Sequence, residues 1–269
     1  MMLKSKIKKI LMKKKYIPIM HPIDSAKQFE GKVALISGGS GGIGLSIAES
    51  LKESGCIVVI AGTDQKKLNV IKNEKQIDTI VMNYLKPEEF EKVIDEVVDR
   101  YGKLDIFISS AGVHTENVNF WTMAPDEFDR VMSINLKGVF FACQAIGKYM
   151  RDQKISGSIL IVSSSRGSEP AWSPYGISKW GLKGLTEGLG KMFIPYGINV
   201  NAISPGSTAT GLIGIKDGDS IASDENGMNR LTMPDEVATL ARLLVSDAGK
   251  MIDGEIIHIA AGRGTFDIR

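Results

Sequence analysis

The stretch Ser37-Gly38-Gly39-Ser40-Gly41-Gly42-Ile43-Gly44 decides the fold of this chain. It follows the apolar run Val33–Ser37 and leads into Ile43–Ser54, which has the apolar periodicity of a helix. Glycines between a strand and a helix let the backbone adopt positive φ angles and approach a ligand closely. The start of the helix offers unpaired N–H groups and a partial positive charge, which suit a diphosphate. The turn therefore predicts a nucleotide-binding α/β domain.

The rest of the chain repeats this alternation of strand and helix. Short runs rich in β-branched residues and Leu predict seven strands buried on both faces: Val33–Ser37, Ile57–Ala61, Thr79–Met82, Asp105–Ser109, Ser158–Ser163, Ile198–Ile203 and Glu255–Ala260. The predicted helices are Ile43–Ser54, Pro87–Tyr101, Pro125–Met150, Pro174–Phe193 and Pro234–Val245. Right-handed crossovers then put all strand carboxyl ends on one rim, where ligands bind. We expect one doubly wound, Rossmann-type α/β domain over residues 29–269, with a mostly parallel seven-stranded sheet and helices on both faces.

Composition excludes several classes of protein. The 269 residues are 43% hydrophobic and 24% charged, as in an ordinary globular domain. Residues 1–20 hold seven Lys and no acid, and removing those charges turns the formal net charge from +2 to −5. The basicity thus belongs to an arm, residues 1–28, and predicts no nucleic-acid partner. Leu3, Ile7, Ile10 and Leu11 form a helical stripe in this arm. The arm docks on a neighbouring subunit, lies at an anionic surface, or is a solubilising tail.

Neither metal chemistry nor membrane insertion is predicted. The two cysteines, Cys56 and Cys143, lie in apolar segments and not at metal-binding or redox spacing. No group of His, Cys, Asp and Glu has the spacing of metal ligands. The apolar stretches near the N-terminus are too short for a signal peptide, and no later run is long enough to span a membrane. A cytoplasmic location is expected.

Tyr175 and Lys179 stand four residues apart at the start of the predicted helix Pro174–Phe193. This spacing places both side chains on one helical face. A free phenol, with a pKa near 10, is a poor base at neutral pH. An ammonium ~4 Å away, at an effective dielectric of ~20, favours the phenolate by ~4 kcal/mol, or ~3 pK units. The pair predicts general acid–base catalysis by Tyr175.

These motifs and their order resemble the short-chain dehydrogenase/reductase family, in its shorter single-domain subclass. The glycines Gly38, Gly42 and Gly44 have the spacing Gly-x-x-x-Gly-x-Gly, and the helix carries Tyr-x-x-x-Lys. The resemblance extends from about Phe29 to Gly262. It implies an oxidoreductase that transfers a hydride between a nicotinamide cofactor and a ketone or secondary alcohol, of the 3-oxoacyl, polyol or sugar-acid type.

The resemblance further implies a catalytic tetrad of Asn135, Ser164, Tyr175 and Lys179. Ser164 would orient the substrate oxygen while Tyr175 passes the proton. Lys179 would lower the Tyr175 pKa and bind the nicotinamide ribose, and Asn135 would hold a water that connects Lys179 to solvent. Because the loop before Tyr175 is slightly shorter than in the family, Ser163 stays an alternative to Ser164.

Cofactor contacts are expected along the rim of the sheet. By resemblance they are Gly38, Ser40, Gly42, Ile43, Gly44, Thr63, Asn83, Ala111, Gly112, Tyr175, Lys179, Pro205, Gly206, Thr208 and Thr210. Ser109 and Ser110 stand where the family has two asparagines. We expect this change to weaken the bracing between strands and to leave the contact with the adenosine ribose.

NADP(H) is favoured over NAD(H). NAD-preferring members place an acid at the end of the second strand, where it binds the ribose 2′-OH and repels a phosphate. Here that position is Gly62, and Asp64 lies too far along the chain. Thr63 would donate to a 2′-phosphate, with Lys66 or Lys67 supplying charge. Asn83 stands where an Asp usually meets the adenine.

The substrate end of the rim is predicted to contain Arg166, Glu169 and Trp172, under a lid from about Ala209 to Met228. These residues favour a polar or anionic small molecule, although Arg166 and Glu169 would equally form an exposed pair worth little energetically. The particular ketone or alcohol does not follow from the sequence. His114 either touches substrate or lies in a surface loop.

Assembly as a homotetramer, or at least a homodimer, is predicted from the Gly-rich and apolar helices Pro125–Met150 and Pro174–Phe193.

Two other classes of function compete with an oxidoreductase. A sugar-nucleotide epimerase would carry a substantial C-terminal substrate domain, and the segment after Pro205 holds only a lid, one helix and one strand. A catalytically silent NAD(P)-binding regulatory protein would have lost a member of the tetrad, and all four are present.

Overall fold

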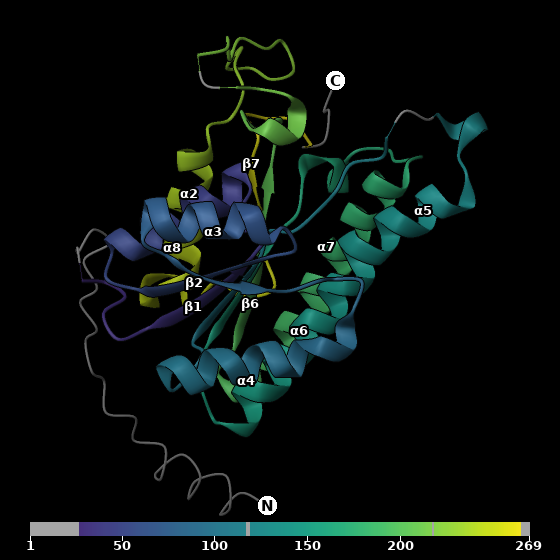
Figure 1. Ribbon diagram of the computed structural model, residues 1–269. Coiled ribbons are helices and arrows are strands. Elements are labelled where there is room, and N and C mark those ends of the chain that lie inside the picture. Colours follow the sequence, from purple (N-terminus) through teal and green to yellow (C-terminus); the bar gives the residue numbers. More distant parts are fainter. Residues whose placement is uncertain (1–26, 117–118, 217, 265–269) are drawn as a thin grey trace, which may run out of the picture.

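The computed structural model describes residues 27–116, 119–216 and 218–264 (Figure 1). Apart from Lys27 and Gln28, the basic arm lies outside these residues. A seven-stranded sheet forms the centre of the molecule, in the order β3-β2-β1-β4-β5-β6-β7, and every neighbouring pair is parallel. The strands are β1 Val33–Ser37, β2 Ile57–Gly62, β3 Asp78–Val81, β4 Ile106–Ser109, β5 Ser158–Val162, β6 Asn199–Pro205 and β7 Ile256–Ile259. The predicted doubly wound fold is confirmed.

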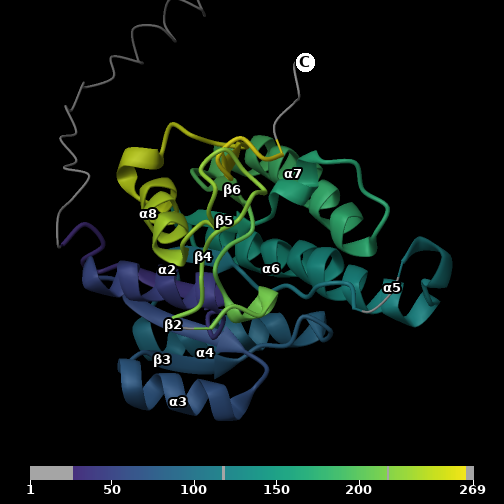
Figure 2. The same cartoon turned by 90° about the horizontal axis from the view of Figure 1, so that it is seen from above.

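Helices cover both faces of the sheet (Figure 2). The helices are α2 Gly42–Glu53, α3 Gln65–Lys75, α4 Phe90–Tyr101, α5 Pro125–Met132, α6 Val139–Asp152, α7 Pro174–Phe193 and α8 Pro234–Val245. Buried side chains of α2, α3 and α8 pack on one face, and those of α4, α6 and α7 pack on the other. The sheet is therefore hydrophobic on both sides, as its continuous apolar runs predict.

The side chains of strand β1 pack into both hydrophobic cores, one on each face of the sheet. Val33 and Leu35 belong to the cluster under α4, α6 and α7, whereas Ala34 and Ile36 belong to the cluster under α2 and α8. Successive side chains of a strand point to opposite faces, so one five-residue run serves both layers. All five residues of β1 are buried.

The observed helices differ from the predicted ones in two places. Helix α3 was not predicted, although Asp64 caps it by accepting hydrogen bonds from the N–H groups of Lys66 and Lys67. Only Leu68 and Ile71 of this helix are buried, so its apolar periodicity is faint. The predicted single helix Pro125–Met150 is divided into α5 and α6 by a π-helical segment, Ser133–Gly138. Such a wide turn commonly marks a functional position.

The order of the strands fixes where a ligand binds. From β1 the chain builds outward to β2 and β3, then returns to place β4 on the other side of β1. The loops after β1 and β4 therefore diverge and leave a crevice at the carboxyl ends of the strands. Within the described residues, no helix is both long and apolar enough to cross a membrane.

Candidate active site

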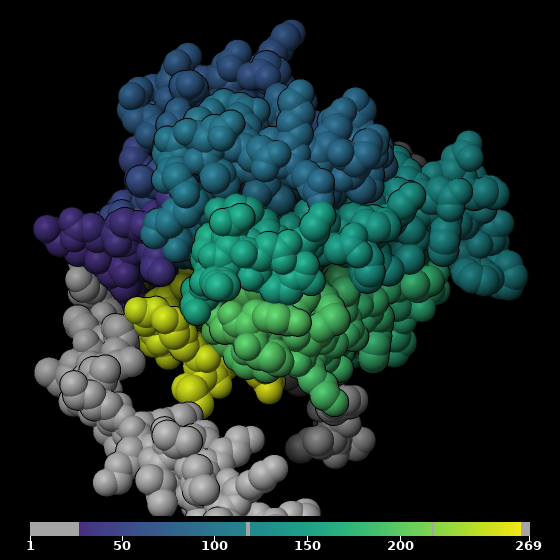
Figure 3. All heavy atoms as spheres, turned by 90° about the horizontal axis from the view of Figure 1, so that it is seen from below, coloured from purple at the N-terminus to yellow at the C-terminus, as the bar shows by residue number. Residues whose placement is uncertain are grey.

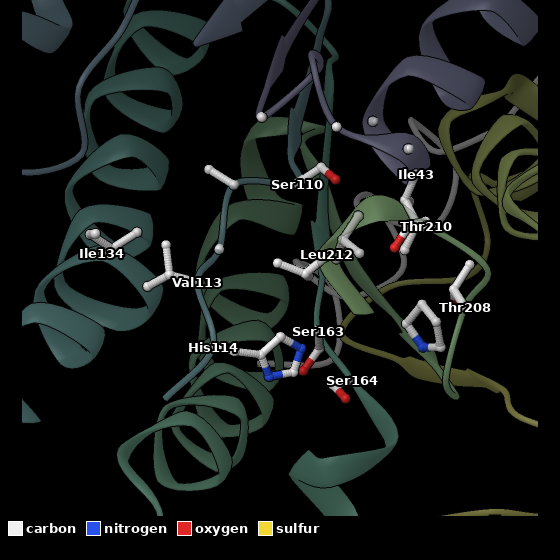
Figure 4. A pocket seen from close by; sticks show the side chains of 18 of the residues that line it. Ile43, Ser110, Val113, His114, Ile134, Ser163, Ser164, Thr208, Thr210 and Leu212 are labelled. Atoms are coloured by element: carbon white, nitrogen blue, oxygen red, sulfur yellow. The ribbon is translucent and has the colours of Figure 1, made fainter. Parts of the chain in front are cut away.

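A pocket of about 440 Å³ opens at this rim. It is lined by the residues predicted to contact a cofactor, namely Gly38, Ser40, Gly42, Ile43, Gly44, Thr63, Asn83, Ala111, Gly112, Tyr175, Lys179, Pro205, Gly206, Thr208 and Thr210. Figure 4 shows Ile43 and Thr210 toward one end of the pocket and His114, Ser163 and Ser164 toward the other. Strand ends far apart in the sequence thus meet around one space.

The glycine turn after β1 is built for close approach. Gly38 has a φ angle of +67°, which favours glycine, and a Cβ on Gly44 would lie 2.5 Å from the Gly38 carbonyl oxygen. A Cβ on Gly42 would lie 2.5 Å from Thr210 Cγ2 of the lid. Gly41, the N-cap of α2, provides no side-chain cap, so the first N–H groups of α2 are left for a ligand. The turn fits the diphosphate of a dinucleotide.

Beyond this turn, Gly62, Thr63 and Asn83 line the outer part of the pocket. The Asp64 carboxylate caps α3, as described above, and Asp64 does not line the pocket. Asn83 uses its side-chain oxygen to accept from the N–H of Leu85 at 2.9 Å, which leaves its amide NH₂ group for a ligand. No acidic residue of the described chain lines this pocket.

Tyr84 bridges the strands where the two asparagines of the family are replaced by serines. Its buried hydroxyl lies 2.5 Å from Ser37 Oγ and 2.8 Å from Ser109 Oγ. Ser37 Oγ also donates to the Ile108 carbonyl at 3.4 Å. The ends of β1 and β4 are therefore braced by a phenol, a contact that the sequence analysis did not predict.

Tyr175 stands in the first turn of α7, which is capped by Ser173 accepting from the N–H of Gly176 at 3.2 Å. The Ser164 hydroxyl accepts from the N–H of Arg166 at 3.3 Å, and its side chain acts to lower the pKa of Tyr175. The neighbouring Ser163 instead directs its hydroxyl to the Lys179 carbonyl, at 3.5 Å. Of the two serines, Ser164 is the one that acts on the pKa of Tyr175.

Burial shifts the pKa values of both Tyr175 and Lys179. Burial raises the pKa of Tyr175, against lowering effects of the Ser164 hydrogen bond and the Arg166 and Arg263 charges. Burial also lowers the pKa of Lys179 to about 8. Its Nζ donates to the Val162 carbonyl at 3.2 Å and lies 5.5 Å from the centre of the Tyr175 ring. Desolvation by burial is the largest cause of both shifts, and the lowering of the Tyr175 pKa by Lys179 stays a prediction.

Asn135 lies fully buried in the π-helical segment. Its side-chain oxygen accepts from the Val113 N–H at 2.9 Å, and its Nδ2 donates to the Val113 carbonyl at 2.8 Å. A Cβ on Gly112 would lie 3.5 Å from Asn135 Oδ1 and 3.8 Å from Lys179 Nζ. Asn135 therefore holds the segment after β4 beside the amine of Lys179.

The three residues predicted to contact substrate separate in the structure. Arg166 lines the pocket, but Glu169 and Trp172 do not. The Glu169 carboxylate is taken by Arg166 at 2.8 Å and by Arg263 at 3.0 Å, while Trp172 is 51% exposed. Arg263 lines the pocket and was not predicted, because nothing in its local sequence marks it.

His114 also lines the pocket, at the catalytic end. Its ring stacks on that of Tyr175, with ring centres 4.2 Å apart and planes inclined by 24°. Burial lowers the pKa of His114, and the charges of Lys179 and Arg166 act in the same direction. His114 therefore lies beside Tyr175 in the pocket, and its contact with substrate stays a prediction.

The chain is similar to several known proteins. A family model described as enoyl-(acyl carrier protein) reductase matches residues 38–263. A short-chain dehydrogenase/reductase of Armillaria gallica is 31% identical over 87% of this chain and 96% of that protein. A 3-oxoacyl-[acyl-carrier-protein] reductase of Rickettsia felis is 34% identical over 86% and 96%. The crystal structure of a 3-ketoacyl-(acyl-carrier-protein) reductase from Brucella melitensis with NADH superposes with a TM-score of 0.79, at 27% identity, over 88% and 98% of the two chains.

A glycine turn for a dinucleotide and a Tyr–Lys pair in one pocket define a nicotinamide-dependent oxidoreductase. The chain belongs to the short-chain dehydrogenase/reductase family. It transfers a hydride between a nicotinamide cofactor and a ketone or secondary alcohol.

Proposed function

We propose that Tyr175 passes the proton in this reaction and that Ser164 holds the substrate oxygen. The observation that carries the proposal is that Tyr175, Ser164 and Lys179 line the same pocket, whose other end fits a diphosphate. When bound, the nicotinamide supplies or accepts the hydride. Both hydroxyls then converge on one substrate oxygen.

The protonation states suit the direction of ketone reduction. Burial keeps the Tyr175 phenol protonated at neutral pH, so it is ready to donate as negative charge develops on the substrate oxygen. Lys179, with a pKa of about 8, is mostly protonated at neutral pH and stabilises the phenolate that results. Alcohol oxidation uses the same groups in reverse.

Asn135 serves as a positioning residue in this proposal. Its amide is engaged at both ends by Val113, so its side chain fixes the loop beside Lys179. The proposed water that connects Lys179 to solvent would bond the remaining amide hydrogen or the main chain of this segment. Asn135→Asp, which cannot donate to the Val113 carbonyl, is expected to lower kcat more than it raises KM.

The first substrates to test are 3-oxo compounds, since relatives of the chain are called 3-oxoacyl-[acyl-carrier-protein] reductases. A panel would add polyol-derived, sugar-acid and steroid ketones and follow oxidation of the reduced cofactor. Ser164→Ala is expected to lower kcat/KM about 100-fold, as loss of one catalytic hydrogen bond does. Ser163→Ala is the matched control and should lose far less. Equal losses in the two variants would contradict the assignment.

NADP(H) is the proposed cofactor over NAD(H). The support is that Gly62 ends β2 without an acid, while Thr63 lines the pocket and Asp64 is committed to capping α3. A Cβ on Gly62 would meet Ser40 Oγ at 3.4 Å and Leu68 Cδ2 at 3.5 Å, so a side chain is tolerated there. Gly62→Asp should therefore shift kcat/KM toward NAD(H) by about tenfold or more, about 1.4 kcal/mol. Gly62→Asn controls for size, and a wild-type preference for NAD(H) of tenfold would overturn the proposal.

A homotetramer, or at least a homodimer, is proposed from the outer faces of α6 and α7. These helices contact each other through Gly147 and Phe193, and Figure 3 shows their surfaces side by side in teal and green. A Cβ on Gly184 or Gly188 of α7 would meet nothing within 4 Å, so this face is open. Gly184→Glu should fold and shift the mass measured by light scattering downward, whereas Lys191→Glu should not. A wild-type monomer at micromolar concentration would contradict the proposal.

The arm of residues 1–28 and a cytoplasmic location are further proposals. Cys56 and Cys143 are both buried free thiols, which is consistent with a reducing compartment. Deletion of residues 1–25 tests whether the arm docks on a neighbouring subunit. Unchanged oligomer mass and melting temperature would exclude docking.

A further inference from the structure

We propose that the substrate of this enzyme is a ketone that carries a carboxylate, and that Arg263 and Arg166 bind the carboxylate while His114 packs against Tyr175 at the reacting carbonyl. The inference rests on the proposed function, because it specifies the substrate class of the same pocket. Its starting point is that Arg263, Arg166 and His114 line the catalytic end of the pocket and come from three distant parts of the chain.

The guanidinium of Arg263 is held by three hydrogen bonds but keeps one nitrogen available as a donor. Its Nε donates to Glu169 at 3.0 Å, and its Nη1 donates to Ser207 Oγ at 2.9 Å and to Glu225. Within the described residues, its Nη2 has no hydrogen-bond partner. The Arg263 side chain is only 14% exposed. A largely buried guanidinium with a vacant donor is suited to a further oxygen anion.

Arg166 provides the second cation. Only its Nη1 is engaged among the described residues, by Glu169 at 2.8 Å, so its Nε and Nη2 remain available. The carboxylates that balance the two arginines, Glu169 and Glu225, do not line the pocket, whereas both arginines do. The two arginines therefore line the pocket, and the two carboxylates that pair with them do not.

The effect of these charges reaches the reacting groups. Arg166 and Arg263 both act to lower the pKa of Tyr175, and Arg166 also lowers the pKa of His114. The charged groups that act on His114 from the elements around it, Lys179 and Arg166, are both positive. The charged side chains that line the catalytic end of the pocket are thus all cationic, and the carboxylate of a keto acid would complement them.

His114 offers a further hydrogen-bonding group to the ligand beside Tyr175. Its ring is stacked on Tyr175, and neither ring nitrogen has a hydrogen-bond partner among the described residues. With its pKa lowered, the imidazole is neutral at pH 7 and offers one N–H donor and one acceptor. A carbonyl or carboxylate oxygen near Tyr175 would satisfy that donor. A small oxo acid presents oxygens of both kinds.

The experiment compares a 3-oxo acid and a 4-oxo acid with their methyl esters, which keep the ketone and remove the charge. Wild-type enzyme should prefer each acid over its ester at least tenfold in kcat/KM. Added salt should raise KM for the acid more than for the ester, because it screens the attraction. In Arg263→Met the acid-to-ester ratio should fall at least tenfold, and Arg166→Met should lower it less.

Two further variants test whether a change in the acid-to-ester ratio results merely from loss of folded protein. Glu225→Gln removes the carboxylate that competes for Arg263, and it should raise the acid-to-ester ratio. Arg151→Met removes an exposed guanidinium paired with Asp152 at the end of α6, and it should leave the ratio unchanged. A ratio that falls in Arg263→Met and rises in Glu225→Gln distinguishes loss of a binding group from loss of folded protein.

An acid-to-ester ratio of one or below in wild type would overturn the inference. If neither compound is turned over, calorimetric titration of the NADP(H)-loaded enzyme decides, and weaker binding of the acid than of the ester overturns it. Failure of the proposed function is separate, since it would appear as ester turnover that survives in Tyr175→Phe.

Discussion

The two ends of the pocket are built from different kinds of atoms. The cofactor end is made of backbone, in the turn Gly38–Gly44 and the loop at Pro205–Gly206, where glycines leave room for main chain to approach a ligand. The catalytic end is made of side chains, where Arg166, Arg263 and His114 surround Tyr175. Backbone binds a diphosphate that all members of a class share, whereas side chains select the one substrate that a member uses. The cofactor end should therefore be sensitive to shape and the catalytic end to charge and proton position.

Tyr175→Phe should have the largest effect and should be confined to catalysis. Loss of the group that passes the proton is expected to lower kcat about 1000-fold, about 4 kcal/mol. Cofactor affinity, measured by fluorescence of the reduced nicotinamide, should stay within a few-fold of wild type. Retention of more than a tenth of the wild-type activity would remove Tyr175 from its assigned role.

Lys179→Met should reveal the cost of burying a charge at the catalytic end. The native pKa of Lys179 is about 8 and the ordinary value is 10.5, so the unfolded chain binds more protons between these values. The wild-type protein therefore becomes more stable as the pH rises from about 8 to 10.5. Below about pH 8, the free energy cost of burying the charged amine of Lys179 is present in full. The variant should be more stable than wild type at pH 7, by on the order of 3 kcal/mol less the lost Val162 hydrogen bond.

The measurement is the denaturant midpoint of both proteins from pH 7 to pH 10. The advantage of Lys179→Met should shrink as the pH rises, while Lys191→Met, an exposed position on α7, should show no such trend. An advantage that is constant with pH would mean that packing, not charge, distinguishes the two proteins.

Gly44→Ala tests the dependence of the cofactor end on shape. The new Cβ would lie 2.5 Å from the Gly38 carbonyl oxygen, and backbone cannot move away cheaply. We expect cofactor binding to weaken about 30-fold, about 2 kcal/mol. Gly41→Ala is the matched control, since its Cβ would lie 3.4 Å from the same oxygen. Similar affinities for the two variants would show that the turn is less constrained than its contacts indicate.

Tyr84→Phe should give the smallest effect and should act on stability. It removes hydrogen bonds from the buried hydroxyls of Ser37 and Ser109, which costs about 1 to 2 kcal/mol in unfolding free energy. Tyr196→Phe, at an exposed position, is the control. A loss of cofactor affinity larger than the loss of stability would place Tyr84 in ligand binding instead of strand bracing.

The contrast between the two ends also explains what the sequence could predict. The seven strands, the glycine turn and the Tyr175–Lys179 pair depend on short-range patterns, periodicity or fixed spacing, and the predicted fold is confirmed. The helix α3 was missed because only two of its residues are buried. The predicted cofactor contacts all line one pocket, since they follow strand ends that the topology gathers at one rim.

The catalytic end was harder to predict because its contacts join distant segments. Arg263 meets Glu169, 94 residues away in the sequence, and Glu225, 38 residues away. No local sequence pattern predicts such a contact. Glu169 was predicted to contact substrate, but its carboxylate pairs with Arg166 and Arg263 and does not line the pocket. The balance between burial and charge at Tyr175 likewise depends on side-chain packing that spacing alone does not supply.

The π-helical segment Ser133–Gly138 has a consequence for how the chain tolerates insertions and deletions. Each residue added to or removed from a helix rotates the remainder of that helix by about 100°. The wide turn shifts the phase between α5 and α6, so that Asn135 faces Val113 while Ala142, Cys143 and Ile146 still face the sheet. Shortening the segment by one residue would turn that apolar stripe of α6 away from its core, although every side chain of the stripe would be kept. Length, as much as composition, is therefore fixed at this point of the chain.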